Sequence, residues 1–187
     1  MGTIKSSLKF IIMFLVLLSL TGCVRLPATK VENIRPDSKL LVMPPLDVVQ
    51  NGRPHIAGSG SGKYLQDSVI FRLGKYSNYQ VMAFAANNEF SHTTPINREK
   101  AIIETEKLGF DYCLLLSLGE FQNAAPFTFR PDYVYLNDAV LIDVRSRKEV
   151  WYLRRRFLRQ KGNLGNHYPL IDQIADLTAK SLKSIAE

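Results

Sequence analysis

A glycine-rich stretch, Gly58-Ser59-Gly60-Ser61-Gly62-Lys63, comes closest among the segments of this chain to a known ligand-binding pattern. A phosphate-binding loop of the Walker type would need glycine at position 57 and serine or threonine at position 64, where this sequence has Ala57 and Tyr64. A dinucleotide-binding loop would need its third glycine at Lys63. The stretch therefore predicts a flexible entry into a helix, whose free amides would hold an anion only weakly.

Other residue types that could do chemistry are scattered along the chain. His55, His92 and His167 fall in expected loops, and none has a second ligand at metal-binding spacing. No serine lies in a nucleophile elbow. Asp143 precedes an expected turn, where its carboxylate should accept backbone hydrogen bonds. We therefore expect no enzyme activity, no metal and no cofactor.

Basic side chains are concentrated between Arg145 and Lys161, where eight Lys or Arg residues accompany a single acid, Glu149. Four of the arginines form a candidate patch for an anionic lipid headgroup, a cell-wall polymer or an acidic partner: Arg154, Arg155, Arg156 and Arg159. On a strand these side chains would alternate, so that Arg154 and Arg156 share a face with Tyr152. The alternative interpretation is a solvated strand edge, where charge deters aggregation.

The first 22 residues have the pattern of a secretory signal peptide. Lys5 and Lys9 make the start basic, an apolar run extends from Phe10 to Leu18, and small residues precede Cys23. These nine apolar residues are too few to span a bilayer, which takes about 20, so a permanent transmembrane helix is the weaker alternative. The pattern predicts export from the cytoplasm, and nucleic acid is therefore not expected as a partner.

The motif Leu20-Thr21-Gly22-Cys23 resembles a lipobox, the processing site of bacterial lipoproteins. The resemblance implies that the lipoprotein signal peptidase recognises Leu20, Thr21 and Gly22, that it cleaves before Cys23, and that this cysteine carries diacylglycerol and an N-linked acyl chain such as palmitate. Two or three acyl chains make release from a membrane very slow. Val24 replaces the acidic residue that retains such proteins in the inner membrane of enteric bacteria, so the resemblance favours the outer membrane, facing the periplasm. The alternative is an ordinary leader with an incidental cysteine.

The domain organisation follows from composition. The segment from Val24 to Ser38 is polar, contains Pro27 and Pro36, and predicts a tether. The 187 residues include 46% apolar and 22% charged side chains, which is typical of one globular domain. We expect a leader at 1–22, a lipidated tether at 23–38 and a single periplasmic domain at 39–187.

Short apolar runs predict strands at 39–43, 79–82, 111–118, 133–144 and 149–158. The third run is apolar on both alternating faces, which indicates a central strand covered on both sides. It contains Cys113, which would have no partner for a disulfide if Cys23 is acylated. We interpret Cys113 as a small buried hydrophobic residue.

The helices are predicted by apolar spacing and by residues that favour helix ends. Apolar residues recur every fourth position from Leu65 to Leu73, with Ser59 or Ser61 available as a cap. A second helix would start at Thr94-Pro95 and stop at Gly109, and a third would start at Pro169. The order β-α-β-α-β-β-β-α predicts an α/β (α+β) fold, with a mixed sheet of about five strands and helices packed on it.

This order of elements, with the runs at 109–118 and 141–151, resembles small envelope domains of the CsgG-like, LpoB-like and TolB amino-terminal type, and also uncharacterised small lipoproteins. The resemblance spans 39–186. It implies the fold and, from the curli-secretion members, a subunit of an oligomeric assembly. Channel-forming members have long membrane-inserting hairpins, and none is evident in this sequence.

Three functions follow in order of preference. The first is a non-enzymatic binding or adaptor lipoprotein that presents its domain to another envelope protein or to the cell wall. The second is a subunit of an oligomeric secretion or envelope assembly. The third is a periplasmic hydrolase, which would require a cleft that joins one of the three histidines to a nucleophile.

Overall fold

The computed structural model describes residues 29–30, 34–35, 37–50, 53–54, 60–122, 132–160 and 168–186 of the chain. The leader and Cys23 lie outside these residues, as do His55 and His167. Among the helices within them, none is long and apolar enough to cross a membrane.

In these ranges, five strands of four or more residues form a mixed sheet that three two-residue strands extend. The longer strands are β2 (Lys39–Val42), β5 (Gln80–Ala83), β6 (Tyr112–Gln122), β7 (Asp132–Asp143) and β8 (Lys148–Gln160). The short ones are β1 (Thr29–Lys30), β3 (Val49–Gln50) and β4 (Arg53–Pro54). The sheet order is β1-β8-β7-β6-β2-β5, with β3 beside β6 and β4 beside β3. β2 is parallel to β5 and β6, and the β6, β7 and β8 neighbours are antiparallel.

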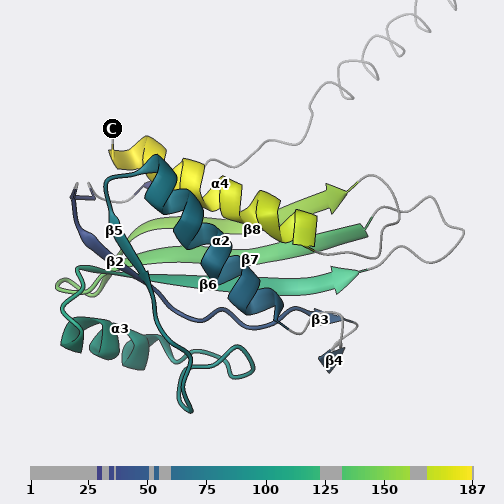
Figure 1. Ribbon diagram of the computed structural model, residues 1–187, viewed down its shortest axis with the longest axis horizontal. Helices are drawn as coiled ribbons and strands as arrows, with labels where there is room; N and C mark the ends of the chain where they lie inside the picture. The colour runs from purple at the N-terminus through teal and green to yellow at the C-terminus, as the bar shows by residue number, and fades with distance from the viewer. Residues whose placement is uncertain are drawn as a thin grey trace, which may run out of the picture.

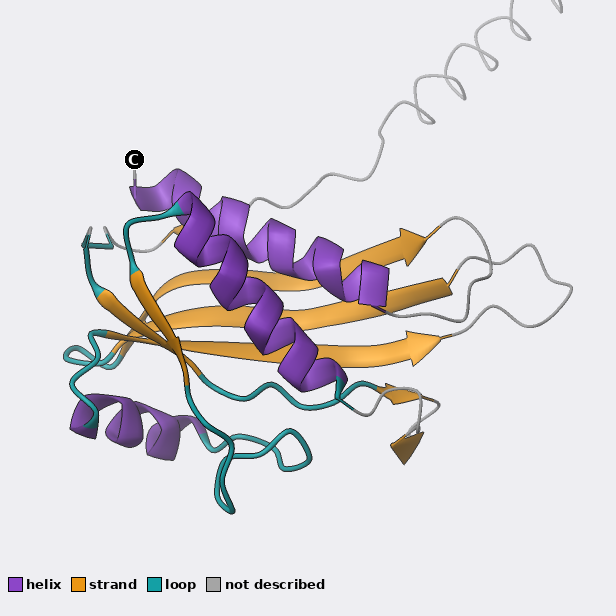
Figure 2. Ribbon diagram, viewed as in Figure 1, coloured by secondary structure: helices purple, strands orange, loops and turns teal. Residues whose placement is uncertain are grey.

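The helices cover both faces of the sheet (Figure 1). They are α2 (Ser61–Tyr76), α3 (Arg98–Lys107) and α4 (Tyr168–Ala186). Figure 2 shows α2 and α4 side by side across one face and α3 beneath one end of the other. The predicted order of elements and the mixed sheet are confirmed.

Two apolar cores result from this layering. The main core lies between the sheet and the α2–α4 pair and includes Leu65, Val69, Leu73, Leu114, Leu136, Trp151 and Ile174. The second core lies on the α3 face and includes Leu41, Phe90, Ile102, Cys113 and Ile142. Successive residues of a strand point to opposite faces, which is why Cys113 and Leu114 enter different cores. The predicted central strand is therefore confirmed as β6.

Cys113 is fully buried, and burial raises the pKa of its thiol to about 11. A thiol with so high a pKa has almost no thiolate at neutral pH, and thiolate is the reactive form. The interpretation of Cys113 as a buried hydrophobic residue is confirmed.

The ends of α3 differ in how well the sequence predicted them. The helix begins at Arg98 and not at Thr94-Pro95, because the side chain of Asn97 accepts a hydrogen bond of 3.0 Å from the Lys100 amide. At the other end Gly109 has a φ of +73°, the left-handed conformation that commonly ends a helix. The predicted stop at Gly109 is confirmed.

The segment before β2 contacts the sheet ahead of the expected domain boundary at Lys39. β1 pairs in antiparallel fashion with β8, so that Thr29 lies opposite Tyr152. Ile34 is 4% exposed and belongs to the main core. Arg35 donates its backbone N–H to the Tyr112 hydroxyl at 3.2 Å. The packed part of the chain thus includes residues upstream of 39.

Candidate functional site

Arg154 is the best described member of the predicted arginine patch. Its side chain is 49% exposed, forms an ion pair of 2.8 Å with Glu149, and lies 4.4 Å from the centre of the Tyr152 ring. The residue opposite it on β7 is Asp138. Burial raises the pKa of the Asp138 carboxyl, against the opposing effect of the Arg154 charge. Arg154 therefore already has anionic and aromatic neighbours within its own domain.

The other arginines of the patch do not form a single row with Arg154 on one face of β8. Arg156 lies opposite Leu136, which is fully buried in the main core, whereas Tyr152 packs against the second core. Residues directly opposite one another in a sheet share a face, so Arg156 and Tyr152 lie on different faces, contrary to the expectation from simple alternation. The backbones of Arg155 and Arg159 lie on β8, but their side chains are outside the described residues.

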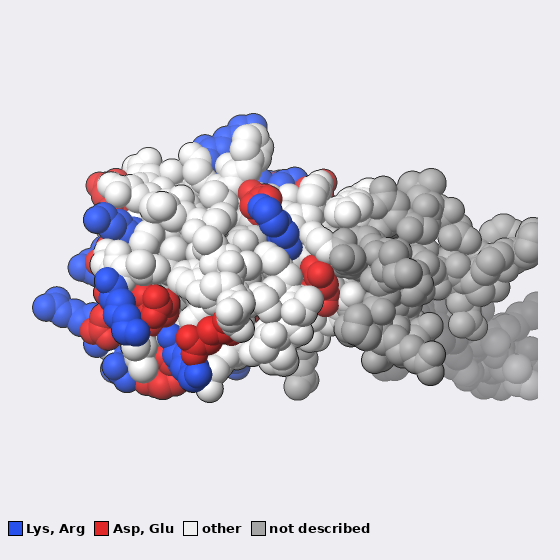
Figure 3. All heavy atoms as spheres, turned by 60° about the horizontal axis from the view of Figure 1, so that its bottom comes forward, with Lys and Arg blue, Asp and Glu red and all other residues white. Residues whose placement is uncertain are grey.

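Acidic residues of α3 offset the basic turn between β7 and β8. Arg147 of that turn forms ion pairs with Glu99 and Glu106, and Arg98 pairs with Glu149 at the start of β8. Figure 3 shows blue and red side chains interleaved at this end of the molecule. The positive charge that is concentrated in the sequence is therefore mixed with negative charge in space.

The glycine-rich stretch leads into α2, and the start of this helix already holds a carboxylate. Asp47 accepts hydrogen bonds from the amides of Gly60 at 3.1 Å and Gly62 at 2.8 Å. The hydroxyl of Ser61 accepts from the Val48 amide at 2.7 Å, and the residue at the cap position is Gly60, which has no side chain, and not the expected serine. An internal anion thus occupies the site where a phosphate would bind.

A second position where α/β folds bind ligands is filled by Gln66. Ligands in open α/β sheets bind at the carboxyl ends of neighbouring parallel strands whose connections leave on opposite faces. β2 and β5 are such a pair, because β2 leads to α2 on one face and β5 leads to α3 on the other. Gln66 is 3% exposed and donates from Nε2 to the carbonyl of Val42 at 2.7 Å and to that of Phe84 at 3.1 Å. Its amide ties the two strand ends together.

The remaining candidates have structural contacts. The Nδ1 atom of His92 is 2.7 Å from the carbonyl oxygen of Pro45. Asp143 accepts a hydrogen bond of 2.7 Å from the Ser146 amide, which confirms the predicted role in the turn. Among the described residues, no group of three or more His, Cys, Asp or Glu side chains is arranged to hold a metal ion.

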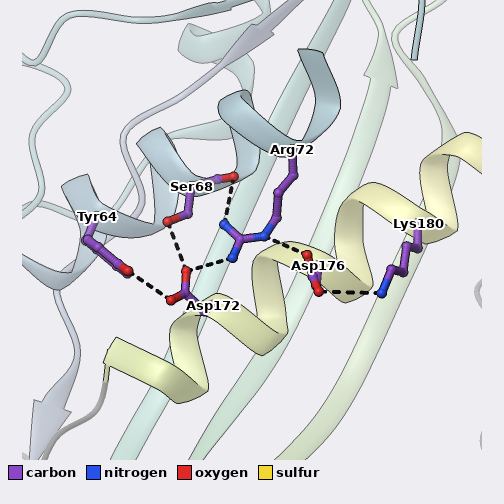
Figure 4. A network of polar contacts seen from close by, with 6 residues as sticks. All are labelled: Tyr64, Ser68, Arg72, Asp172, Asp176 and Lys180. Carbon is purple, nitrogen blue, oxygen red and sulfur yellow. Dashed lines mark hydrogen bonds and ion pairs between the residues drawn. The ribbon is translucent and has the colours of Figure 1, made fainter. Parts of the chain in front are cut away.

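A polar network that was not among the expectations from the sequence joins α2 to α4 (Figure 4). Arg72 of α2 pairs with Asp172 at 2.9 Å and with Asp176 at 2.6 Å. Asp172 also accepts from the Tyr64 hydroxyl at 2.9 Å, and Asp176 lies 3.5 Å from Lys180. We call these residues, with Ser68, the interhelix network.

A signal for this network exists in the sequence. Tyr64, Ser68 and Arg72 recur every fourth residue on α2, and Asp172, Asp176 and Lys180 do so on α4. Two polar rows at this spacing can face each other along two packed helices. Burial raises the pKa of Asp176, but hydrogen bonds from Arg72 and the charge of Lys180 outweigh it, so the net pKa is lowered. The network joins the helices through one guanidinium that two carboxylates share.

Comparison with known proteins finds similarity in structure only. No known protein family matches the sequence, and neither does any curated protein. The PelC dodecamer from Paraburkholderia phytofirmans is 13% identical, with a TM-score of 0.59, over 83% of this chain and 94% of that one. At this identity the likeness shows a shared fold.

Two further solved structures are similar over much of the chain. Lipoprotein GNA1162 from Neisseria meningitidis is 18% identical, with a TM-score of 0.49, over 79% of this chain and 99% of that one. The LpoB C-terminal domain from Salmonella enterica is 15% identical, with a TM-score of 0.42, over 68% and 86%. An LpoB domain was among the expected resemblances, and the CsgG-like and TolB-like ones stay predictions.

Proposed function

We propose that this chain is a lipoprotein of a bacterial envelope, anchored through Cys23, whose domain binds another envelope component and catalyses no reaction. The observation that carries the proposal is the motif Leu20-Thr21-Gly22-Cys23 directly after a short apolar run. Lipidation there would confine the domain to a membrane surface. Val24, in place of an acidic residue after the cysteine, favours the outer membrane.

The contacts within the domain favour binding over catalysis. Groups that could have formed a reactive centre are engaged in structural roles, since Asp47 caps α2, Gln66 joins two strand ends and Arg72 holds the carboxylates of α4. Buried polar groups that bond to one another stabilise a fold, and they are not available for a substrate. The exposed surface is then the part that a partner would contact.

Metabolic labelling tests the anchor. Cells that express the wild-type chain and the variant Cys23→Ala are fed an alkyne analogue of palmitate and then fractionated. We expect the wild type to carry label and to be recovered with membranes, and the variant to lack label and to remain uncleaved at the lipobox. A matched control, Cys113→Ala, should keep the label, because this thiol is buried. An unlabelled wild-type protein, or a mature amino terminus at another residue, would reject the proposal.

In-cell crosslinking with mass spectrometry tests the binding role. The wild type is compared with a variant in which Arg154, Arg155 and Arg156 are changed to Gln, and with a control in which Lys63 and Lys100, exposed at other places, are changed to Gln. If the arginines contact a partner, only the first variant loses specific crosslinks, and it stays in the membrane fraction. Recovery of no specific partner from the wild type, together with turnover of a substrate by the purified protein, would overturn a binding function.

A homo-oligomeric assembly is the second candidate function, and the likeness to the PelC dodecamer supports it. The shared fold would supply the same kind of surface for contacts between copies. Light scattering with the lipidated protein in detergent and with a form that starts at Val24 in buffer should then give a mass several times that of one mature chain. A monomer in both conditions would exclude this candidate.

A further inference from the structure

The first pairing in the sheet lies very close in sequence to the proposed lipid. β1 begins at Thr29, so only residues 24–28 separate it from Cys23. Six residue steps span at most about 20 Å when fully extended. Downstream of β1 the chain is held further, since Ile34 is in the main core and Arg35 forms an ion pair of 3.0 Å with Asp111. The link between lipid and domain is therefore short.

We propose that this short link holds one particular side of the domain, the edge formed by β1 and β8, against the phospholipid surface. The inference rests on the proposed lipidation of Cys23 and adds an orientation to it. The partner of this edge is the headgroup layer of the bilayer itself. The opposite edge, formed by β5, then faces away from the membrane and is the side available to other envelope components.

The direction of β1 determines which part of the β8 edge is nearest the membrane. Because β1 is antiparallel to β8, its amino-terminal end points along β8 from Tyr152 toward Gln160. At about 3.3 Å per residue, the maximum reach of the link corresponds to the stretch of β8 from Tyr152 to about Leu158. In the described residues, β1 is the only strand on the outer side of β8, and it covers just Trp151 and Tyr152.

The far side of the domain is out of reach of this link. β1 and β5 are the two ends of the sheet order and lie five strand spacings apart, or about 24 Å at 4.8 Å each. Figure 1 shows the end of β8 and the start of α4 at one end of the sheet, and α3 at the other. A lipid tethered near β8 cannot bring β5 to the bilayer without turning the whole domain over.

Charge is consistent with this orientation. The half of β8 that follows Tyr152 contains Arg154, Arg155, Arg156 and Arg159 and no acidic residue. The opposite end combines the basic β7–β8 turn with Glu99 and Glu106 of α3. Basic residues near an anionic leaflet add to membrane attraction, whereas a balanced surface does not. The basic half of β8 is the half toward which β1 points.

Nitroxide quenching measures the orientation directly. Single cysteines are introduced into the lipidated protein that carries Cys113→Ala, at two near positions (Arg154→Cys and Tyr168→Cys) and two far positions on β5 (Gln80→Cys and Met82→Cys). All four side chains are exposed in the native chain, so a fluorophore can be attached. The proteins are reconstituted into vesicles of phosphatidylethanolamine and phosphatidylglycerol that contain a lipid with a nitroxide headgroup.

We expect severalfold stronger quenching at the two near positions than at the two far ones. A variant with twenty Gly and Ser residues inserted between Cys23 and Thr29 should lose most of this difference, because such a linker adds about 25 Å of average reach. Equal quenching at all four positions overturns the proposal. A difference that survives the insertion also overturns it, since charge alone would then orient the domain.

The outcomes of these experiments distinguish a failure of lipidation from a failure of the proposed orientation. If Cys23 is not lipidated, the protein does not float with the vesicles, and the proposed function fails before the orientation is measured. If the protein floats but shows no difference in quenching, only the orientation is wrong. Loss of an in-cell protein crosslink by the arginine variant, with equal quenching at all positions, would assign the basic half of β8 to an acidic protein instead of the bilayer.

Discussion

At the scale of single residues, two glycines of the same helix, α2, differ in whether packing requires them to be glycine. A Cβ on Gly62 would lie 2.2 Å from the carbonyl oxygen of Pro45 and 2.9 Å from Nδ1 of His92. A Cβ on Gly74 would meet nothing within 4 Å. Gly62 therefore permits the close approach of α2 to the loop after β2, and Gly74 has no packing reason to be glycine.

The variants Gly62→Ala and Gly74→Ala should consequently change stability in opposite directions. We expect Gly62→Ala to lower the free energy of unfolding by about 1–3 kcal/mol, because backbone must move to make room. Gly74→Ala should raise it by about 0.5–1 kcal/mol, because alanine favours a helix more than glycine does. Equilibrium urea unfolding measures both, and a loss of stability for Gly74→Ala would contradict the role given to that position.

At the scale of elements, the interhelix network determines how α2 and α4 pack over the sheet. Arg72 is 19% exposed and contacts two carboxylates from a helix that lies 100 residues further along the chain. Removal of the guanidinium would leave Asp172 and Asp176 close together without their shared cation. The network thus makes the relative position of the two helices depend on a charge.

Arg72→Met should lower the free energy of unfolding by about 1–2 kcal/mol at neutral pH, since the ion pairs are partly exposed. Lys100→Met is the matched control, because the Lys100–Glu89 pair is more than half exposed on both sides, and it should cost at most about 0.5 kcal/mol. Equal effects of the two substitutions in urea unfolding would show that the network adds nothing beyond a surface ion pair.

The same network predicts a dependence on pH. The folded-state pKa of Asp176 is lowered, so its contribution to stability is complete above the unfolded-state pKa of about 3.9 and is lost as the pH falls through the folded value. The difference in unfolding midpoint between wild type and Arg72→Met should therefore be constant from pH 7 to pH 5 and shrink below about pH 4. A difference that grows on acidification would have the wrong sign.

At the scale of the whole molecule, the folded unit includes part of the segment that was expected to be a tether. β1 extends the sheet and Ile34 fills part of the main core, so these residues contribute to the stability of the domain as well as linking it to Cys23. If Cys23 carries the proposed lipid, a segment that is both strand and link restricts the rotation of the domain on that anchor.

A soluble form that starts at Lys39 should be less stable than one that starts at Val24. The single variant Ile34→Ala in the longer form should cost about 2–4 kcal/mol, because it removes a buried side chain. Met82→Ala, at a residue that is 58% exposed, is the control and should change stability by less than about 0.5 kcal/mol. Identical urea midpoints for the two lengths would place the domain boundary at Lys39.

The sequence alone determined the order of the elements and the layers they form. The spacing of Leu65, Val69 and Leu73, the apolar faces of β6 and the stop at Gly109 are local patterns, and each reflects a backbone geometry that repeats every two or every 3.6 residues. The turn contact of Asp143 follows from neighbours three residues away. Local periodicity was sufficient for these features.

The tertiary structure decided which distant groups meet. Asp47 caps α2 across a gap of 13 residues to Gly60, and Arg72 meets Asp172 across 100. Arg156 shares a face with Leu136 and not with Tyr152, and at this level the β6–β7 pairing shifts register between Ser117 opposite Asp138 and Leu118 opposite Leu136. Such contacts depend on strand register and helix packing, which are set by the fit of the whole core, and no short stretch of sequence contains that information.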